Sequence, residues 1–276
     1  MSSGTPVPDI RLTREAGRVV VVTISRPPVN ALNWELKRAL VSFLEEVRDD
    51  EEVRCVVFAS DLPKTFCAGS DLYELTKDHA RPGSATERTK FEFEMWQLLS
   101  GLPKPSVAAV EGHALGSGME LAVACDFRIA GANAAFGLPE IKIGGAPGVQ
   151  TLARLPFLAG FGAARRMLLV GASIGAAEAY RVGLVDELVP QGQALETAMT
   201  LARTLAAQPA SSMKFLRSSL AVVMVAALEA VEPVVMGGVE ELFLAPEMRE
   251  GIKAFLEKRP PEFEAAVVAA RSAAGR

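Results

Sequence analysis

The first part of the chain alternates a short apolar run with a helical pattern. Residues 19–24, VVVVTI, form a β-branched run that is typical of a strand. The run is followed by Pro27 and Pro28, which lack the backbone N–H that a paired strand needs. Asn33 then caps a predicted helix, and a second strand is predicted over residues 54–59. The apolar positions of that helix recur at helical spacing: Leu36, Leu40, Phe43, Leu44 and Val47.

The middle of the chain continues this alternation. A polar stretch from Thr76 to Lys90 resembles a mobile loop. After it, the pattern predicts a helix over 91–99, a strand over 106–110, a helix over 119–125 and a strand over 126–130. The residues between the strand 106–110 and the helix 119–125, numbers 112–118, are rich in glycine.

Beyond residue 160 the pattern becomes mostly helical. It predicts helices over 163–170, 175–182, 196–207, 211–228 and 247–258, with one strand over 184–189. Strands that alternate with helices indicate an α/β fold, and the final helices indicate a packing extension. We therefore divide the chain into a core, residues 1–190, and a helical C-terminal region, residues 191–276.

The composition describes a folded protein that lacks a nucleic-acid surface. Half of the 276 residues are hydrophobic and 22% are charged, which excludes disorder of the whole chain. The chain has 29 basic and 33 acidic residues and no basic run, so we expect no nucleic-acid partner. Runs without a charged residue are about 11 residues or shorter, whereas a membrane-spanning helix needs about 18 apolar residues. We therefore expect no membrane partner either.

Cysteine and histidine usage indicates a reducing compartment and no metal site. Cys55, Cys67 and Cys125 lie in apolar surroundings without a CxxC pair, which is typical of buried reduced thiols. The N-terminal residues resemble neither a signal peptide nor a transit peptide, so we expect a cytoplasmic location. His79 and His113 are too far apart in the sequence for a local zinc motif, and no metal is expected.

Candidate chemistry lies in residues 66–72 (FCAGSDL), 112–120 (GHALGSGME) and 136–141 (FGLPEI). A turn that opens a helix leaves about four amide N–H groups unpaired, and these favour negative charge together with the helix dipole. Glu120 follows the glycine-rich turn in an apolar helix, and Glu140 lies in an apolar loop. Burial would raise the pKa of both carboxyls, and the two form a candidate general acid/base pair.

Each of these features also has a purely structural interpretation. The glycines at 116 and 118 would permit close packing of a strand–helix turn, and a single buried glutamate is more often a paired structural residue. The spacing GxxxGxG is neither the GxGxxG of a dinucleotide site nor a P-loop. The residues alone leave both a packing role and an oxyanion site open.

The segments, taken in order, resemble the crotonase superfamily, specifically its enoyl-CoA hydratase/isomerase branch. Residues 26–33 (RPPVNALN) resemble the first turn of that family, and residues 66–72 resemble its AGxDL segment. Residues 104–130 resemble its longest signature, residues 175–190 a later stretch, and residues 248–259 its C-terminal segment. The resemblance covers nearly the whole chain.

This resemblance implies a fold, a substrate and an assembly. The fold is a spiral of ββα turns with a helical C-terminal region that packs at a trimer interface, commonly doubled to a hexamer. The substrate is a CoA thioester whose carbonyl oxygen meets the backbone amides of Ser70 and Ser117. No cofactor is implied, because coenzyme A is part of the substrate. Charge moves onto that oxygen during the reaction, and each donor in a dry site contributes about 2.7–4 kcal/mol.

Both glutamates of the family's hydratases are matched, which favours a reversible enoyl-CoA hydratase over a single-glutamate isomerase. The resemblance implies that Glu120 deprotonates water for attack at the β-carbon and that Glu140 protonates the α-carbon. The substrate-binding residues that it implies are Arg26, Val29, Ala31, Ala68, Asp71, Leu72, Gly116, Pro139, Phe255 and Lys258.

Departures from the family pattern leave alternatives open. Ser117 stands where the family usually has glycine, so its hydroxyl either crowds the thioester or adds a donor, and a positive φ there would be strained. Residues 147–155 lack glycines that typical hydratases carry, which leaves the acyl chain length open. The alternative functions are an isomerase, a C–C hydrolase, a thioesterase or a CoA-ester-binding protein of low activity. Lys258 is either a nucleotide contact or a solvated charge, and Trp96 is expected to serve packing.

Overall fold

The larger of two β-sheets forms the centre of the molecule. The computed structural model describes residues 9–78 and 81–274. The larger sheet has the strand order β1-β2-β3-β5-β7-β10, and its pairs are parallel except β1 with β2. Its strands are β1 (Ile10–Glu15), β2 (Val19–Ile24), β3 (Cys55–Ser60), β5 (Ser106–Val110), β7 (Phe127–Gly131) and β10 (Glu187–Val189).

The smaller sheet has the order β4-β6-β8-β9. Its strands are β4 (Thr65–Cys67), β6 (His113–Leu115), β8 (Ala135–Gly137) and β9 (Ser173–Gly175). In the chain β3 leads to β4, β5 to β6 and β7 to β8, so each turn adds one strand to each sheet before the next helix. This repeat confirms the α/β class and the spiral of ββα turns.

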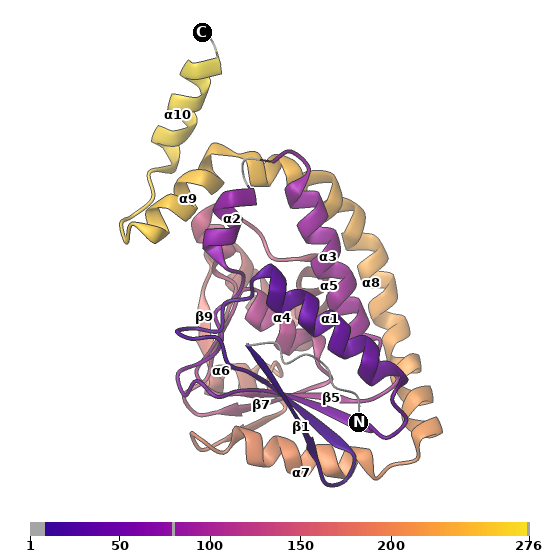
Figure 1. Cartoon of the computed structure of the whole chain (residues 1–276). Coiled ribbons are helices and arrows are strands. Elements are labelled where there is room, and N and C mark those ends of the chain that lie inside the picture. Colours follow the sequence, from indigo (N-terminus) through magenta and orange to yellow (C-terminus); the bar gives the residue numbers. More distant parts are fainter. Residues whose placement is uncertain (1–8, 79–80, 275–276) are drawn as a thin grey trace.

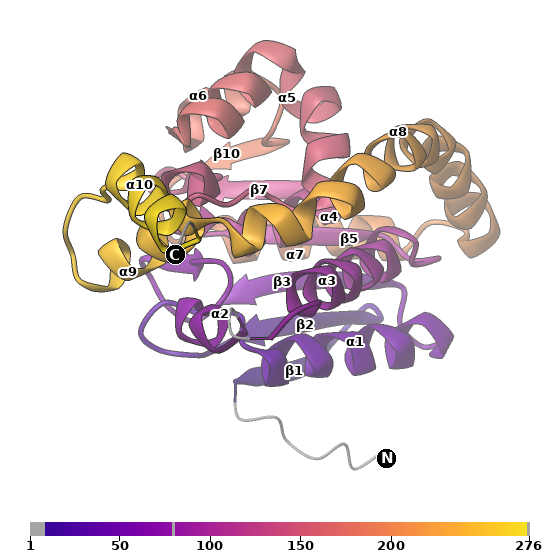
Figure 2. The same ribbon diagram turned by 90° about the horizontal axis from the view of Figure 1, so that it is seen from above.

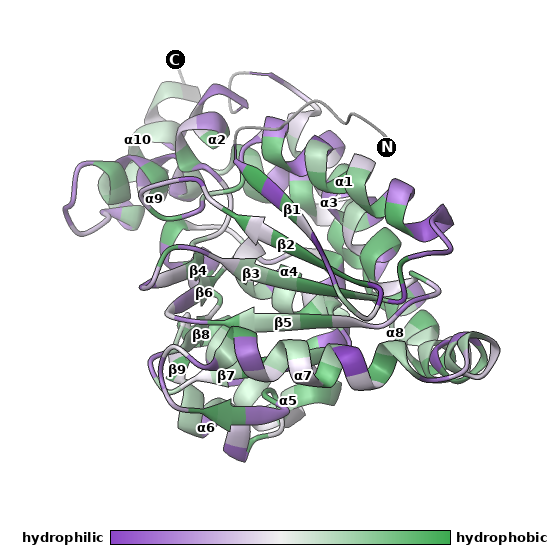
Figure 3. Cartoon of the chain, turned by 60° about the horizontal axis from the view of Figure 1, so that its bottom comes forward, coloured by the Kyte–Doolittle hydropathy of each residue, from purple (hydrophilic) through white to green (hydrophobic). Residues whose placement is uncertain are grey.

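Helices cover both faces of the larger sheet (Figure 1, Figure 3). The helices up to residue 206 are α1 (Trp34–Asp49), α2 (Leu72–Asp78), α3 (Ser84–Ser100), α4 (Ser117–Ala124), η1 (Pro139–Ile143), α5 (Val149–Val170), α6 (Ala176–Arg181) and α7 (Ala194–Ala206), the last of which belongs to the C-terminal region by the division at residue 190. Val20 and Val22 of β2 pack in the cluster that includes α1 and α4, whereas Val19 and Val21 pack against α7. Burial on both faces explains why the strands are continuous apolar runs.

The last helices lie on the outside of the core. They are α8 (Ala210–Leu244), α9 (Pro246–Leu256) and α10 (Phe263–Ala274). Helix α8 runs along one side and packs on α3 and α5, while α10 extends away from the core beside α9 (Figure 1, Figure 2). Much of the apolar surface of α8 is exposed, including Phe215, Leu216, Leu220, Val222, Val223 and Val234.

Helix α8 is also the one helix of the described residues that is long and apolar enough to cross a membrane. This property rests on length and composition alone, and a single helix of this kind is weak evidence of a span. The helix contains no long uninterrupted apolar run, because glutamates such as Glu229 and Glu232 interrupt the run without making the helix polar.

Several predicted boundaries were wrong. The polar stretch 76–90 is largely helical, since α2 ends at Asp78 and α3 begins at Ser84. Its polar residues have partners: Arg88 bonds with Asp78, and Glu240 of α8 accepts the backbone N–H of Gly83 at 2.6 Å. The helix predicted over 211–228 continues to Leu244, and the one predicted from residue 163 begins at Val149, before a kink at Gly160.

Candidate active site

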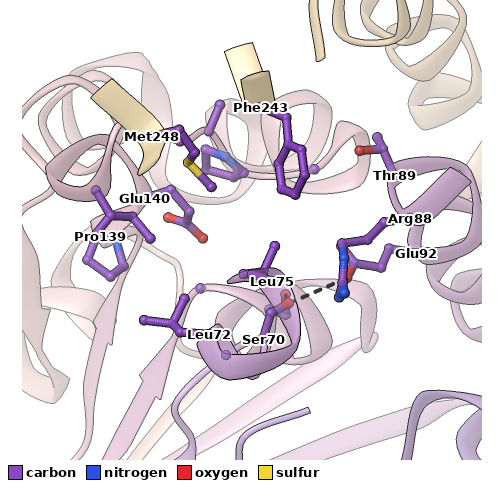
Figure 4. A pocket seen from close by; sticks show the side chains of 18 of the residues that line it. Ser70, Leu72, Leu75, Arg88, Thr89, Glu92, Pro139, Glu140, Phe243 and Met248 are labelled. Carbon is purple, nitrogen blue, oxygen red and sulfur yellow. Dashed lines mark hydrogen bonds and ion pairs between the residues drawn. The ribbon is translucent and has the colours of Figure 1, made fainter. Parts of the chain in front are cut away.

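A cavity of about 380 Å³ lies between α2, α3, α4 and η1 on one side and the C-terminal helices α8 and α9 on the other. All three segments singled out in the sequence contribute to its wall. In Figure 4, Pro139 and Glu140 lie on one side of the cavity and Arg88 and Glu92 on the other. The apolar part of the wall includes Leu72, Leu75, Val239, Leu242, Phe243 and Met248.

The loop after β4 presents the backbone amide of Ser70. Leu32 donates its N–H to Gly69 O at 2.7 Å and accepts from Asp71 N at 3.0 Å. Because these partners flank Ser70 in an extended pairing, its own amide points to the opposite side. Asn30 holds this arrangement in place, with its side-chain amide donating to Phe66 O at 3.0 Å and to Ser60 Oγ at 2.8 Å.

The glycine-rich turn presents the amide of Ser117 at the N-terminus of α4. Gly116 takes the positive φ of 52°, so Ser117 begins the helix without the strain that a positive φ would impose. As the first residue of the helix, Ser117 has an N–H with no intrahelical acceptor. A Cβ at Gly118 would lie 2.1 Å from the carbonyl oxygen of Cys67. The turn thus combines close packing with an amide that has no acceptor within the helix, and the two interpretations are compatible.

Glu120 is buried, and both of its carboxylate oxygens accept a hydrogen bond. Gly148 N donates to Oε1 at 2.6 Å, and Trp96 Nε1 donates to Oε2 at 3.2 Å. Burial raises the pKa of Glu120 to about 7, and the charge of Glu92 adds to the rise. The two donors fix the orientation of a carboxylate that can accept a proton near neutral pH.

Glu140 lies on η1, and its carboxyl is beside Gly116, the residue that precedes the helix carrying Glu120. Its Oε2 is buried and has no hydrogen-bond partner among the described residues. Burial, together with the charge of Glu120, raises the pKa of Glu140 to about 8. Both carboxyls line one cavity, and Glu140 is the more fully protonated of the two at neutral pH, as a proton donor must be.

Comparison with known proteins decides the relationship. The family model described as Enoyl-CoA hydratase/isomerase matches residues 14–266. The chain belongs to this family. A 2,3-dehydroadipyl-CoA hydratase from Escherichia coli (strain K12) is 38% identical over 255 residues, which cover 90% of this chain and 95% of that protein. A short-chain-enoyl-CoA hydratase from Clostridium acetobutylicum is 32% identical over 255 residues, 91% of this chain and 96% of that protein.

The fold is shared by relatives of different activity. The crystal structure of the human mitochondrial delta3-delta2-enoyl-CoA isomerase superimposes with a TM-score of 0.82 at 26% identity, covering 91% of this chain and 97% of that one. Membership of the enoyl-CoA hydratase/isomerase family, and thus of the crotonase superfamily, is confirmed. The fold alone does not distinguish a hydratase from an isomerase, so the choice depends on the side chains in the cavity.

The residues expected at the substrate site of this family member fall into two groups. The cavity wall includes Ala68, Ser70, Leu72, Gly116, Ser117, Glu120, Pro139, Glu140 and Phe255. Arg26, Val29, Ala31, Asp71 and Lys258 are not among its lining residues. Arg26 is already paired, with Asp71 at 2.9 Å and Asp9 at 3.3 Å. Val29 accepts from the backbone N–H of Ala68 at 3.0 Å, so the 29–31 turn lies directly beside the cavity loop.

Sequence reasoning missed several side chains around the cavity of this hydratase/isomerase family member. Trp96 does pack in the core, as expected, but its indole also donates to Glu120. Lys37 is fully buried and pairs with Glu92 of α3. Neither residue lies in a recognised motif, and Lys37 occupies a helix position that the apolar pattern leaves polar. No cluster of His, Cys, Asp and Glu that could hold a metal occurs within residues 9–78 and 81–274.

The raised pKa of Glu140 predicts a pH-dependent stability. A carboxyl whose pKa rises from 4.5 to about 8 on folding stabilises the fold at low pH, and this contribution is lost as the pH rises through 8. Glu140→Gln removes the titration. The quantity to measure by calorimetry is the Tm of this variant minus the Tm of the unsubstituted protein. We expect this difference to increase by about 3 °C or more from pH 5 to pH 9. A constant difference across this range would contradict the buried, proton-retaining carboxyl.

Proposed function

We propose that the protein is an enoyl-CoA hydratase that adds water reversibly to a 2-enoyl-CoA thioester. The observation that carries this proposal is the pair of buried carboxyls in one cavity, Glu120 and Glu140, beside the amides of Ser70 and Ser117, which have no acceptor within residues 9–78 and 81–274. Adding water across a double bond needs one group to take a proton and another to give one. An isomerase moves a single proton and needs only one such group.

In the proposed mechanism the thioester oxygen binds between the amides of Ser70 and Ser117. Glu120 removes a proton from water, the hydroxyl forms its bond to the β-carbon, and the electrons of the double bond move toward the thioester oxygen. Glu140 then gives its proton to the α-carbon, and transfer of a proton from Glu120 to Glu140 through solvent restores both groups. Dehydration follows the reverse path.

The first test is the loss of enoyl-thioester absorbance after addition of crotonyl-CoA, and then of a longer 2-enoyl-CoA. Loss that depends on Glu140 supports hydration and ranks the acyl chain lengths. Conversion of a 3-enoyl-CoA to its 2-enoyl isomer without hydration would instead identify an isomerase. Release of free CoA would identify a thioesterase, and binding of every ester without turnover would identify a CoA-ester-binding protein.

The proposed path of coenzyme A follows the 29–31 turn and the loop after β4 to the exposed Phe255 and Lys258. Backbone groups of Val29, Ala31 and Ala68 supply much of the contact in this proposal, together with Asp71. Arg26 contributes by fixing Asp71, with which it pairs at 2.9 Å. The substrate supplies coenzyme A, and we propose no further cofactor and no metal.

Lys258 allows a direct test of that path. It lies just past the C-terminus of α9, where its backbone N–H bonds to Phe255 O at 3.1 Å. If its ammonium binds a CoA phosphate, Lys258→Ala raises the Kd for a saturated acyl-CoA by about 3- to 10-fold and makes that Kd less dependent on salt. Isothermal titration at two salt concentrations measures this. An unchanged Kd identifies Lys258 as a solvated charge.

We propose a homotrimer, or a hexamer built from two trimers, in the cytoplasm. The exposed apolar side chains of α8 support an assembly, because a surface of this kind is normally covered by a partner. Light scattering of the purified protein measures the number of copies. A monomer at micromolar concentration would contradict this proposal, and recovery with the membrane fraction would point to the alternative use of α8.

A further inference from the structure

Two serine hydroxyls meet where the proposed oxyanion hole lies. Ser70 Oγ and Ser117 Oγ are 2.9 Å apart, although they come from the loop after β4 and from the N-terminus of α4. This separation is within the range of a well-formed O–H···O hydrogen bond. Both residues line the cavity. The hydroxyls of the two residues whose amides face the thioester oxygen are therefore linked to each other.

A buried ammonium group is attached to one end of this pair. Lys37 of α1 has a fully buried side chain, and its Nζ lies 3.2 Å from Ser70 Oγ and 2.5 Å from Glu92 Oε1. An ammonium group only donates hydrogen bonds, so Ser70 Oγ and Glu92 Oε1 must both accept from it. The ion pair with Glu92 keeps the positive charge of Lys37 inside the protein, next to the cavity.

Either serine can be the donor within the hydroxyl pair, and the distances around Ser70 favour one of the two directions. Ser70 has one proton to donate, and its acceptors are Ser117 Oγ at 2.9 Å and Glu92 Oε1 at 3.4 Å. The shorter contact favours donation to Ser117. Ser117 then has a proton of its own and no other hydrogen-bond acceptor for it among the described residues. That proton is available to a group bound in the cavity.

We propose that the Ser117 hydroxyl is a third donor to the thioester oxygen and that Lys37 is a positioning residue, which orients and polarises this hydroxyl through Ser70. The donor order is Lys37, Ser70, Ser117, thioester oxygen, and successive hydrogen bonds of this kind strengthen one another. This inference rests on the proposed function, because it assumes that a thioester oxygen binds at the two amides. It also selects between the two roles that the sequence left open for the serine: the hydroxyl adds a donor.

A chromophoric ester tests the hydroxyl without requiring turnover. The absorption of 4-(dimethylamino)cinnamoyl-CoA shifts to longer wavelength when its carbonyl oxygen receives stronger hydrogen bonds. We expect a shift on binding to the unsubstituted protein and a smaller shift with Ser117→Ala or Lys37→Met. With a 2-enoyl-CoA substrate, kcat falls by about 10-fold or more in each variant, while the Kd of a saturated acyl-CoA changes by less than about 3-fold.

The double variant separates positioning from a structural role. If Lys37 acts through the hydroxyl, Lys37→Met alone lowers both kcat and the spectral shift. The same substitution added to Ser117→Ala then has little further effect. Lys104→Met is the matched control, because Lys104 is a partly buried lysine that donates to Val47 O and Asp50 O, outside the cavity. Equal effects of Lys37→Met in both backgrounds would overturn the proposal.

The remaining outcomes distinguish this inference from the proposed function. A spectral shift that is unchanged in Ser117→Ala overturns the third donor and leaves the two amides intact. A larger shift in Ser117→Ala means that the hydroxyl oxygen faces the thioester, which also overturns it. No shift with the unsubstituted protein counts against the oxyanion hole itself and therefore against both proposals. If Lys37→Met does not fold, because Glu92 loses the nearer of its two cationic partners, Lys37→Met/Glu92→Gln and Ser70→Ala carry the same test.

Discussion

We expect Glu140→Gln to lower kcat for hydration by about 10²–10⁴-fold while the Kd of a saturated acyl-CoA changes little. Glutamine keeps the shape of the side chain but has no acidic proton to give to the α-carbon. Glu140 holds that proton near neutral pH because of its burial and because Glu120 lies beside it. Initial rates of absorbance loss from a 2-enoyl-CoA, together with a binding titration, measure the two quantities separately.

Glu111→Gln is a matched control for this experiment. Glu111 is a partly buried glutamate outside the cavity, and its Oε1 accepts from Gly192 N at 2.8 Å and from Ala194 N at 3.1 Å. Its replacement is expected to change stability but not kcat. If Glu140→Gln retains kcat within about threefold, Glu140 is not the proton donor and the hydratase mechanism is wrong.

Glu120→Gln is expected to lower kcat by a similar factor and, unlike Glu140→Gln, to lower stability as well. The carboxylate of Glu120 accepts from two fixed donors, Gly148 N and Trp96 Nε1. A glutamine side chain offers only one oxygen, so its NH₂ group must face one of these N–H donors. The buried donor left without an acceptor costs about 1–3 kcal/mol. Calorimetry and initial rates on the same preparation measure both effects.

A comparison of the two variants at two pH values separates the lost hydrogen bond from the titration. At pH 5, where both carboxyls hold their protons, Glu120→Gln is expected to be less stable than the unsubstituted protein and Glu140→Gln about equally stable. At pH 9 both variants gain stability relative to the unsubstituted protein, because each removes an ionised buried carboxylate. Glu120→Gln with full stability and reduced kcat would mean that Trp96 and Gly148 do not hold the carboxylate. Full activity would remove Glu120 from the mechanism.

Strongly patterned segments allowed much of the fold to be predicted. The strands at 19–24 and 106–110 are confirmed at their predicted positions, because runs buried on both faces are apolar throughout. The strands of the smaller sheet were missed because three residues are too few to show an alternation. The full length of α8 was missed because apolar residues on both its packed and its exposed sides leave no helical period to detect.

The residues of the site also divide into those that the sequence predicted and those that it did not. Glu120, Glu140, Ser70 and Ser117 could be proposed because each lies in a short motif with glycine or proline beside it. Their supporting residues come from other elements, and only the folded chain brings these to the motif. Lys37 is an example, since it lies 33 positions before Ser70, its hydrogen-bond partner. Sequence spacing carries no sign of such a contact.

The hydrogen bond between Trp96 and Glu120 makes the protein a candidate for label-free spectroscopy. The chain has two tryptophans, and Trp34 lies apart from this bond, in a T-shaped contact with Phe91. With Trp34 replaced by phenylalanine, all tryptophan fluorescence comes from an indole whose N–H is bonded to the carboxyl of Glu120. Its emission is therefore expected to change as that carboxyl gains or loses a proton. Emission spectra recorded over a range of pH would then follow the ionisation of a single glutamate in solution. A stopped-flow measurement of the same emission would follow the rate of that ionisation.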